Sequence, residues 1–409
     1  MAVILVQKKT IFYALIFTAS ILNSIIALLD VLSSARILDP ITLTVYIFWA
    51  GLIVQTIGII ILYLPTKRGK LGKLIDPAFE GLYIPRKKGL VYIILASLAS
   101  VLNTVFYFQV ASIGDPSTLL PLAQFTTVYL LVIDAILQKD KPTIIETSSV
   151  IIITIGAFLA AITTEKMDLI TALLALGPMN IMSTIYIYLL KRISSTVEDN
   201  RKIDSISLRY WLIFYMTLQI TPFYLISCPY EITQILHEFI SSFLILSVDM
   251  GLTFLAMIMY IRALSMGKMS IVNALVSLSA IFGIGVSFIG SWLFPNYVQI
   301  PVYNFFVIIT KTFGAILVVL GVFLLLLSET STYILLKIDQ KRAKELLEEL
   351  SKVNGIETVS AVVGEFDIIA KLNIRSLAKA YDILIKRLAR LKGIEEIFIV
   401  SILKEWEKI

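Results

Sequence analysis

Ten apolar runs of about 20 residues divide most of this chain, and they constrain its fold more than any other feature. A helix needs about 20 apolar residues to cross the hydrocarbon core of a bilayer. Only 16% of the 409 residues are charged, whereas soluble domains have about a quarter of their residues charged. The sequence therefore predicts an all-α polytopic protein of the cell membrane. The predicted spans are residues 10–29, 41–64, 90–113, 117–137, 143–163, 168–190, 209–228, 238–262, 269–294 and 302–328.

The placement of Lys and Arg between these spans predicts the orientation of the chain. Taken alternately, the connecting segments carry 18 Lys and Arg on one side, against only Arg36 and Lys166 on the other. Cytoplasmic loops are enriched in Lys and Arg, so we expect both termini in the cytoplasm. The most basic loop, residues 65–89, is explained by this topology and by attraction to anionic lipid headgroups. Nucleic-acid binding is the weaker interpretation of that loop.

An internal repeat relates the two halves of the membrane part. With a shift of 153 residues, YFQVASIGDPSTLLPL from Tyr107 aligns with YIRALSMGKMSIVNAL from Tyr260. Each half then holds five spans, and an odd number gives the second half the opposite orientation. Inverted repeats of this kind build transporter sites near the bilayer midplane. We expect two five-helix halves, residues 1–165 and 166–329.

The membrane part resembles a known transporter family. The Gly-Asp-Pro-Ser turn, the following LLPLAQFTTVYLLVIDAIL, the helix containing Gly156 and the second copy ending GAILVVLGVFLLLL are similar to EamA-type members of the drug/metabolite transporter superfamily. The resemblance covers residues 10–328 and implies a ten-helix secondary transporter. That family has an acidic residue before its fifth and tenth helices. Asp140 approximates it in the first half, and residues 295–301 offer none in the second.

The C-terminal segment has a different character, because 14 of the 35 basic and 12 of the 29 acidic residues follow Tyr333. TYILLKID, ETVSAVVG, FDIIAKLN and IFIVSIL read as strands, and apolar residues at helical spacing predict helices near 343–353 and 376–391. The order βαββαβ predicts a ferredoxin-like α+β domain over residues 330–409. Such a small unit buries a modest core and tends to pair through its sheet, so we expect a homodimer.

This segment also resembles a known domain. Val363-Gly364-Glu365-Phe366-Asp367 and Leu391-Lys392-Gly393-Ile394 are similar to two turns of the Lrp/AsnC-type ligand-binding domain, over residues 333–405. The resemblance implies an ACT-like sensor of amino acids or similar effectors, with Gly364, Phe366 and Asp367 as candidate effector-site residues. Alternatively, Gly364 permits a tight turn and Phe366 belongs to the core. Ten spans stand where a DNA-binding helix-turn-helix would precede the domain, so we expect no nucleic-acid partner.

Polar residues inside the predicted spans mark a candidate transport site. An ionisable group at the bilayer centre costs at least about 2.5–3.5 kcal/mol, and Asp249 lies near the middle of the eighth span. Thr253 and Tyr260 continue its helix face, and the repeat maps this stripe onto Asn103 and Tyr107. The substrate-binding or coupling candidates are Asp249, Thr253, Tyr260, Asn103, Tyr107, Asn23, Asn180 and Lys311, with Gln55 and Gln219 at similar depths.

Each candidate also has a structural interpretation. Amides and hydroxyls often bond across helices as packing contacts. Asp249 could be a structural acid paired with Lys311, and Lys311 could instead extend to the outer interface. Asp134 reads as an interfacial acid. The pairs Gly156 with Ala160, and Gly314 with Gly321, predict close helix packing rather than a dimer seam.

These patterns favour a gradient-driven transporter of a small metabolite, an amino acid or a related compound, regulated by the cytoplasmic sensor. A non-transporting membrane receptor is the alternative, followed by a membrane-tethered transcription regulator. We expect no enzyme activity, because no nucleophile–base pair is apparent. We expect no metal or other cofactor either, since the chain has one cysteine, Cys228, and one histidine, His237, and lacks G-x-x-x-x-G-K-[ST].

Overall fold

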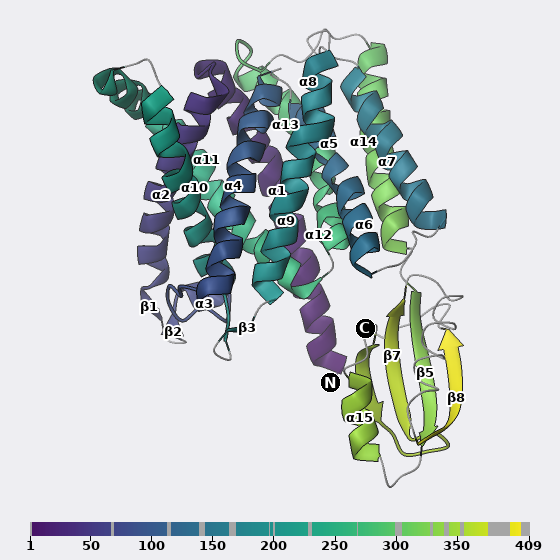
Figure 1. Cartoon of the computed structure of the whole chain (residues 1–409). Coiled ribbons are helices and arrows are strands. Elements are labelled where there is room, and N and C mark those ends of the chain that lie inside the picture. The colour runs from purple at the N-terminus through teal and green to yellow at the C-terminus, as the bar shows by residue number, and fades with distance from the viewer. Residues whose placement is uncertain are drawn as a thin grey trace. The chain divides into compact units, whose positions relative to one another are not determined.

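A computed structural model describes most of the chain (Figure 1). The chain divides into two compact units. The first unit comprises residues 1–141 and 149–322, and the second comprises residues 142–148 and 323–409. The described residues are 2–66, 69–112, 116–138, 144–162, 169–195, 197–198, 201–227, 231–267, 269–298, 305–327, 330–338, 343–351, 356–374 and 393–401.

Helices lie in all ten of the ranges that the apolar runs predict. Among the residues that the structure describes, six helical segments are long and apolar enough to cross a membrane, which makes this a multi-pass membrane protein. The helices are α1 (Ala2–Arg36), α2 (Pro40–Leu62), α4 (Lys87–Ala111), α5 (Pro116–Ala123), α6 (Phe125–Gln138), α7 (Ile144–Ile162), α8 (Leu169–Leu174), the π-helical η1 (Ala175–Met179), α9 (Asn180–Ser195), α10 (Ser205–Ser227), α11 (Ile232–Met266), α12 (Met269–Val276), α13 (Leu278–Leu293) and α14 (Phe305–Leu327).

Short elements occupy the connections that the charge pattern assigns to the cytoplasm. The basic loop 65–89 contains the hairpin strands β1 (Pro65–Thr66) and β2 (Gly69–Lys70) and the single turn α3 (Gly72–Ile75). A second hairpin, β3 (Val197–Glu198) with β4 (Arg201–Lys202), precedes α10.

Two of the predicted spans are interrupted helices. The fourth span breaks at Gln124, between α5 and α6, and the ninth breaks at Ser277, between α12 and α13. The two positions are 153 residues apart, the same shift that aligns Tyr107 with Tyr260. At both breaks a backbone amide bonds to the carbonyl three residues earlier, as in a 3₁₀ turn. Thr127 N donates to Gln124 O at 2.9 Å, and Ala280 N donates to Ser277 O at 2.9 Å.

Glycines allow α7 and α14 to approach each other closely. A Cβ added at Gly156 would lie 2.6 Å from Gly314 O and 2.7 Å from Val318 N. One added at Gly321 would lie 2.8 Å from Ser149 O. Because these are backbone atoms, they cannot rotate away. The predicted close packing at Gly156, Gly314 and Gly321 is confirmed.

The C-terminal residues fold into a four-stranded antiparallel sheet with one described helix. The elements are β5 (Thr330–Ile338), α15 (Ala343–Ser351), β6 (Ile356–Ala361), β7 (Ile368–Ile374) and β8 (Ile394–Ser401), and the strand order is β6-β7-β5-β8. This order is that of a ferredoxin-like fold and agrees with the predicted βαββαβ arrangement. The second predicted helix, near residues 376–391, lies outside the described residues.

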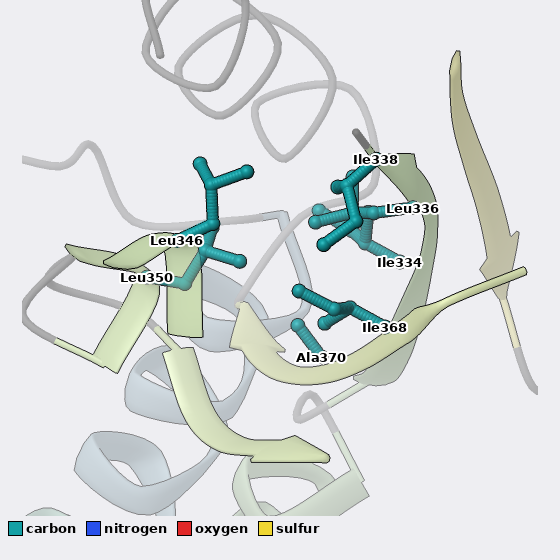
Figure 2. Packing of buried hydrophobic residues seen from close by; sticks show 7 residues of the cluster. All are labelled: Ile334, Leu336, Ile338, Leu346, Leu350, Ile368 and Ala370. Atoms are coloured by element: carbon teal, nitrogen blue, oxygen red, sulfur yellow. The ribbon is translucent and has the colours of Figure 1, made fainter. Parts of the chain in front are cut away.

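The core of this domain lies between the sheet and α15 (Figure 2). Side chains alternate along a strand, so Ile334, Leu336 and Ile338 of β5 point to the same face, and all three are buried. Leu346 and Leu350 meet them from α15 at the predicted helical spacing. Ile368 and Ala370 of β7 complete the cluster. The domain thus has an apolar core of its own.

Candidate functional site

Two buried carboxyl groups lie side by side in the helical unit. Asp249 of α11 is fully buried and Asp30 of α1 is 5% exposed, and the two carboxyl groups are close enough to interact electrostatically. Tyr107 of α4 donates its hydroxyl to Asp30 Oδ2 at 2.7 Å. Thr253 makes a longer contact, 3.5 Å from its Oγ1 to Asp249 Oδ1. Three helices therefore contribute to one acidic cluster, here called the acid pair site.

Asp249 thus lies beside Asp30, whereas the sequence predicts Lys311 as its partner. The Lys311 side chain of α14 is 7% exposed and donates from Nζ to Ser117 Oγ on α5 at 3.1 Å. Among the described residues Lys311 makes no ion pair with Asp249. Lys311 therefore joins α14 to α5 rather than pairing with Asp249, and it is buried rather than extended to the outer interface.

Asp30 is the functional candidate that sequence reasoning missed. The first span was predicted to end at residue 29, but α1 continues to Arg36. The signal was present, because apolar pairs flank the acid in Leu28-Leu29-Asp30-Val31-Leu32 and Ser33-Ser34-Ala35 follow. A helix continued through these small residues places Asp30 inside the span.

The acid pair site has the chemistry of a proton-binding site. Two carboxylates that share a buried site repel each other, and one bound proton relieves the repulsion. Asp249 Oδ2 has no hydrogen-bond partner among the described residues. This oxygen is therefore available to bind a proton or to accept a hydrogen bond from a bound ligand. Tyr107 and Thr253, which the sequence placed on matching stripes, both contact the pair.

Asn180 satisfies the backbone where the fourth span is broken. Its Oδ1 accepts from Thr126 N at 2.8 Å and from Thr126 Oγ1 at 2.6 Å. Its Nδ2 donates to Leu122 O at 3.0 Å and to Ala175 O. The structural interpretation therefore accounts for all of its contacts, and its role is to hold α5, α6 and η1 together.

Side chains of α1 serve the equivalent break in the ninth span. Ser24 Oγ lies 3.0 Å from Ser279 O, and Ser20 Oγ lies 3.4 Å from Leu275 O. Leu275 and Ser279 lie 153 residues after Leu122 and Thr126. Polar side chains of a neighbouring helix, Asn180 of α9 and Ser20 and Ser24 of α1, thus lie at each break.

The remaining candidates are distributed around these two features. Tyr260 donates to Asn273 Oδ1 at 3.4 Å, and Asn273 Nδ2 donates to Thr127 Oγ1 at 2.8 Å, which links α11 to α6 beside its break. Asn23 and Asn103 are partly buried, with no side-chain partner among the described residues. Gln55 is fully buried and neither of its amide atoms is bonded within the described chain, whereas Gln219 Nε2 donates to Ile94 O at 3.0 Å.

The candidate effector residues lie in the turn between β6 and β7. Gly364 is exposed, and no atom lies within 4 Å of where its Cβ would be. It lacks the positive φ of a turn that requires glycine. Phe366 is partly buried and meets Phe398 of β8 edge to face, with ring centroids 5.2 Å apart.

Asp367 supports the sheet directly. Its carboxylate accepts from Ile338 N at 2.9 Å, and its own amide donates to Leu336 O at 3.0 Å. These bonds lie where the pairing of β5 with β8 shifts register between Lys337 and Ile338. Asp367 therefore has a structural role, and Gly364 is the exposed one of the three candidates.

Comparison with known proteins identifies the C-terminal domain. Residues 331–408 match the model of the Lrp/AsnC ligand binding domain. The C-terminal domain is an Lrp/AsnC ligand-binding domain. This domain type implies a small-molecule effector and typical dimerisation. The match extends the predicted range of 333–405 by a few residues at each end.

Two solved structures are similar to this chain, with low sequence identities and low TM-scores. The crystal structure of PH0061 is 18% identical, covers 32% of this chain and 76% of its own, and has a TM-score of 0.19. Another, described only as the crystal structure of a protein, is 13% identical, covers 77% of this chain and 97% of its own, and has a TM-score of 0.48. No curated protein matches the chain.

Proposed function

We propose that this protein is a proton-coupled secondary transporter of a small metabolite, an amino acid or a related compound, controlled by its Lrp/AsnC domain. The observation that carries the proposal is the acid pair site, in which Asp30 and Asp249 meet inside two of the long apolar helices. Ionisable groups within membrane helices are costly and mark ion or substrate pathways by default. A pair of carboxyls is suited to binding and releasing a proton.

The interrupted helices support a transport role. Secondary transporters of the inverted-repeat kind bind their cargo where discontinuous helices expose backbone ends within the membrane. Non-helical backbone at that depth is tolerated only where it is buried in protein or lines a cavity. Here both breaks occur at repeat-equivalent positions, Gln124 and Ser277. We include in the proposal the EamA-type architecture, with inverted halves 1–165 and 166–329 and both termini in the cytoplasm.

Protonation of the acid pair site provides a coupling step. When the pair holds a proton, α1 and α11 can pack closely with little repulsion between the two carboxyls. When the proton leaves, the extra negative charge favours water or a cationic group of the cargo beside the pair. A ligand that interacts differently with two states shifts their populations, so cargo and proton would together bias which side of the protein is open.

The Lrp/AsnC domain would regulate this step. Helix α14 ends at Leu327 and β5 begins at Thr330, so the connection is too short to isolate the last membrane helix mechanically from the domain. Effector binding, and pairing of two domains into a homodimer, would therefore bias the position of α14. An amino-acid-like effector would make the domain a sensor of cargo or of a related metabolite.

The test of transport is uptake of the twenty radiolabelled amino acids by proteoliposomes under an inward proton gradient. We expect the wild-type protein to accumulate at least one of them and Asp249→Asn to fall to the level of empty liposomes, because the amide cannot exchange a proton. Glu231→Gln is the matched control, since Glu231 is an exposed acid at the start of the same helix whose side chain makes no cap bond. It should transport normally.

A second outcome would favour the receptor alternative. If the wild-type protein binds an amino acid but accumulates none in either direction of the gradient, the transport proposal is wrong. Uptake by Asp249→Asn equal to that of the wild type would remove the role of the acid pair and leave transport standing.

A further inference from the structure

We propose that Arg209 and Tyr186 form a subsite for the carboxylate group of a bound ligand. Assigning that carboxylate to the cargo rests on the proposed transport function, but the subsite itself does not. The observation behind it is a buried cation to which the described part of the chain supplies no anion.

Arg209 is buried without a charged partner. It lies one turn into α10 and is 5% exposed. Its Nε has no hydrogen-bond partner, and no carboxylate of the described residues pairs with the guanidinium. The Tyr186 hydroxyl of α9 interacts electrostatically with the guanidinium and meets no hydrogen-bond criterion within the described chain.

The two acids at the start of α10, Asp76 and Asp204, already accept hydrogen bonds from other groups. Asp76 accepts from Ser205 N at 2.8 Å and from Ser205 Oγ at 2.6 Å. Asp204 accepts from Ser207 N at 2.8 Å and from Ser207 Oγ at 2.8 Å. Burial raises the pKa of the Asp204 carboxyl above its ordinary value. Both acids thus cap the start of α10 and leave Arg209 unneutralised.

An unpaired buried charge costs several kcal/mol of stability, so a site that keeps one is expected to gain its partner on binding. A guanidinium presents a planar fork of donors that matches a carboxylate with two parallel hydrogen bonds. Tyr186 offers a third, neutral donor. One positive charge neutralises one negative charge, which favours a carboxylate over a phosphate dianion.

The surroundings connect this subsite to the interrupted helix. Tyr260 interacts electrostatically with Tyr186, and its hydroxyl bonds to Asn273, which bonds to Thr127. Thr127 follows the break at Gln124. Hydrogen-bonded side chains of α11, α12 and α6 therefore lead to the break, and we place the rest of a ligand whose carboxylate is held by Arg209 on this side of the subsite.

The experiment titrates the purified full-length protein with sodium acetate, as the simplest carboxylate, at constant ionic strength in sodium chloride, and follows thermal unfolding. We expect a saturable rise in Tm for the wild type. In Arg209→Met the rise should disappear, while Tm without acetate should increase because the unneutralised charge is gone. Tyr186→Phe should keep the wild-type Tm without acetate and require several-fold more acetate.

Several results would overturn the subsite. These are no saturable response in the wild type, an unchanged response in Arg209→Met, or a lower Tm of that variant without acetate, which would make Arg209 a structural residue. If Arg209→Met fails to fold, Tyr186→Phe decides, and an unchanged acetate midpoint contradicts the proposal. A response to inorganic phosphate equal to that to acetate would contradict the carboxylate assignment.

The acetate titration involves no transport, so the two proposals fail separately. An acetate response that depends on Arg209, together with no uptake of any amino acid, would retain the subsite and reject transport. Uptake without any acetate response would reject the subsite alone.

Discussion

At the scale of single residues, Asn180 replaces the hydrogen bonds that the backbone loses where α5 gives way to α6. Its four bonds join Leu122, Thr126 and Ala175 in a buried region. Backbone groups buried in an apolar environment without partners cost about 1–3 kcal/mol each. A single side chain therefore stabilises an interruption that would otherwise be unfavourable within a membrane.

Replacing Asn180 by Ala should destabilise the helical unit by about 2–4 kcal/mol, because buried donors and acceptors at the break lose their partner. The measurement is Tm of the purified protein. Asn23→Ala is the matched control, since Asn23 is partly buried and makes no side-chain bond among the described residues. It should leave Tm nearly unchanged. Equal effects of the two substitutions would show that Asn180 does not support the break.

The sequence predicted Asp249 correctly as a buried acid, because a charge in the middle of an apolar run stands out. It did not predict Asp30, since the end of a span is set by where the helix is packed and not by hydropathy alone. Nor did it predict the acid's partner. Charge complementarity predicted Lys311 as the partner, whereas packing of α1 against α11 brings the two acids together.

At the scale of helices, the two breaks show where local sequence signals end. The first follows Pro121, which removes one backbone donor within α5. The second, at Ser277, has no proline near it, so local propensity does not predict it. The 153-residue repeat does relate the two positions, although the break itself becomes evident only in the structure.

Gly156→Leu should destabilise the contact between α7 and α14, because its Cβ would lie 2.6 Å from Gly314 O. Overpacking of this kind costs about 1–3 kcal/mol. The measurements are Tm and the fraction of monodisperse protein. Gly285→Leu in α13 is the control, since no atom lies within 4 Å of its added Cβ, and it should be tolerated. A Gly156 variant as stable as the control would contradict the close packing.

At the scale of the whole molecule, the chain combines a helical membrane unit with an Lrp/AsnC domain. The order of elements in that domain could be predicted from alternating and helically spaced apolar residues, whereas the strand order β6-β7-β5-β8 is evident only in the structure. The role of Asp367 could not, because an acid in a turn gives no indication that it bonds to a neighbouring strand. The turn therefore contains a structural acid, Asp367, together with the exposed Gly364 and the partly buried Phe366.

The most direct measurement of the central claim follows protons rather than cargo. Proteoliposomes holding a pH-sensitive dye would be given the amino acid identified by uptake, with no gradient imposed. We predict a change of internal pH that accompanies cargo entry for the wild type and for Glu231→Gln, and none for Asp30→Asn or Asp249→Asn. Cargo entry without proton movement, or a wild-type signal from either aspartate variant, would contradict proton coupling at the acid pair site.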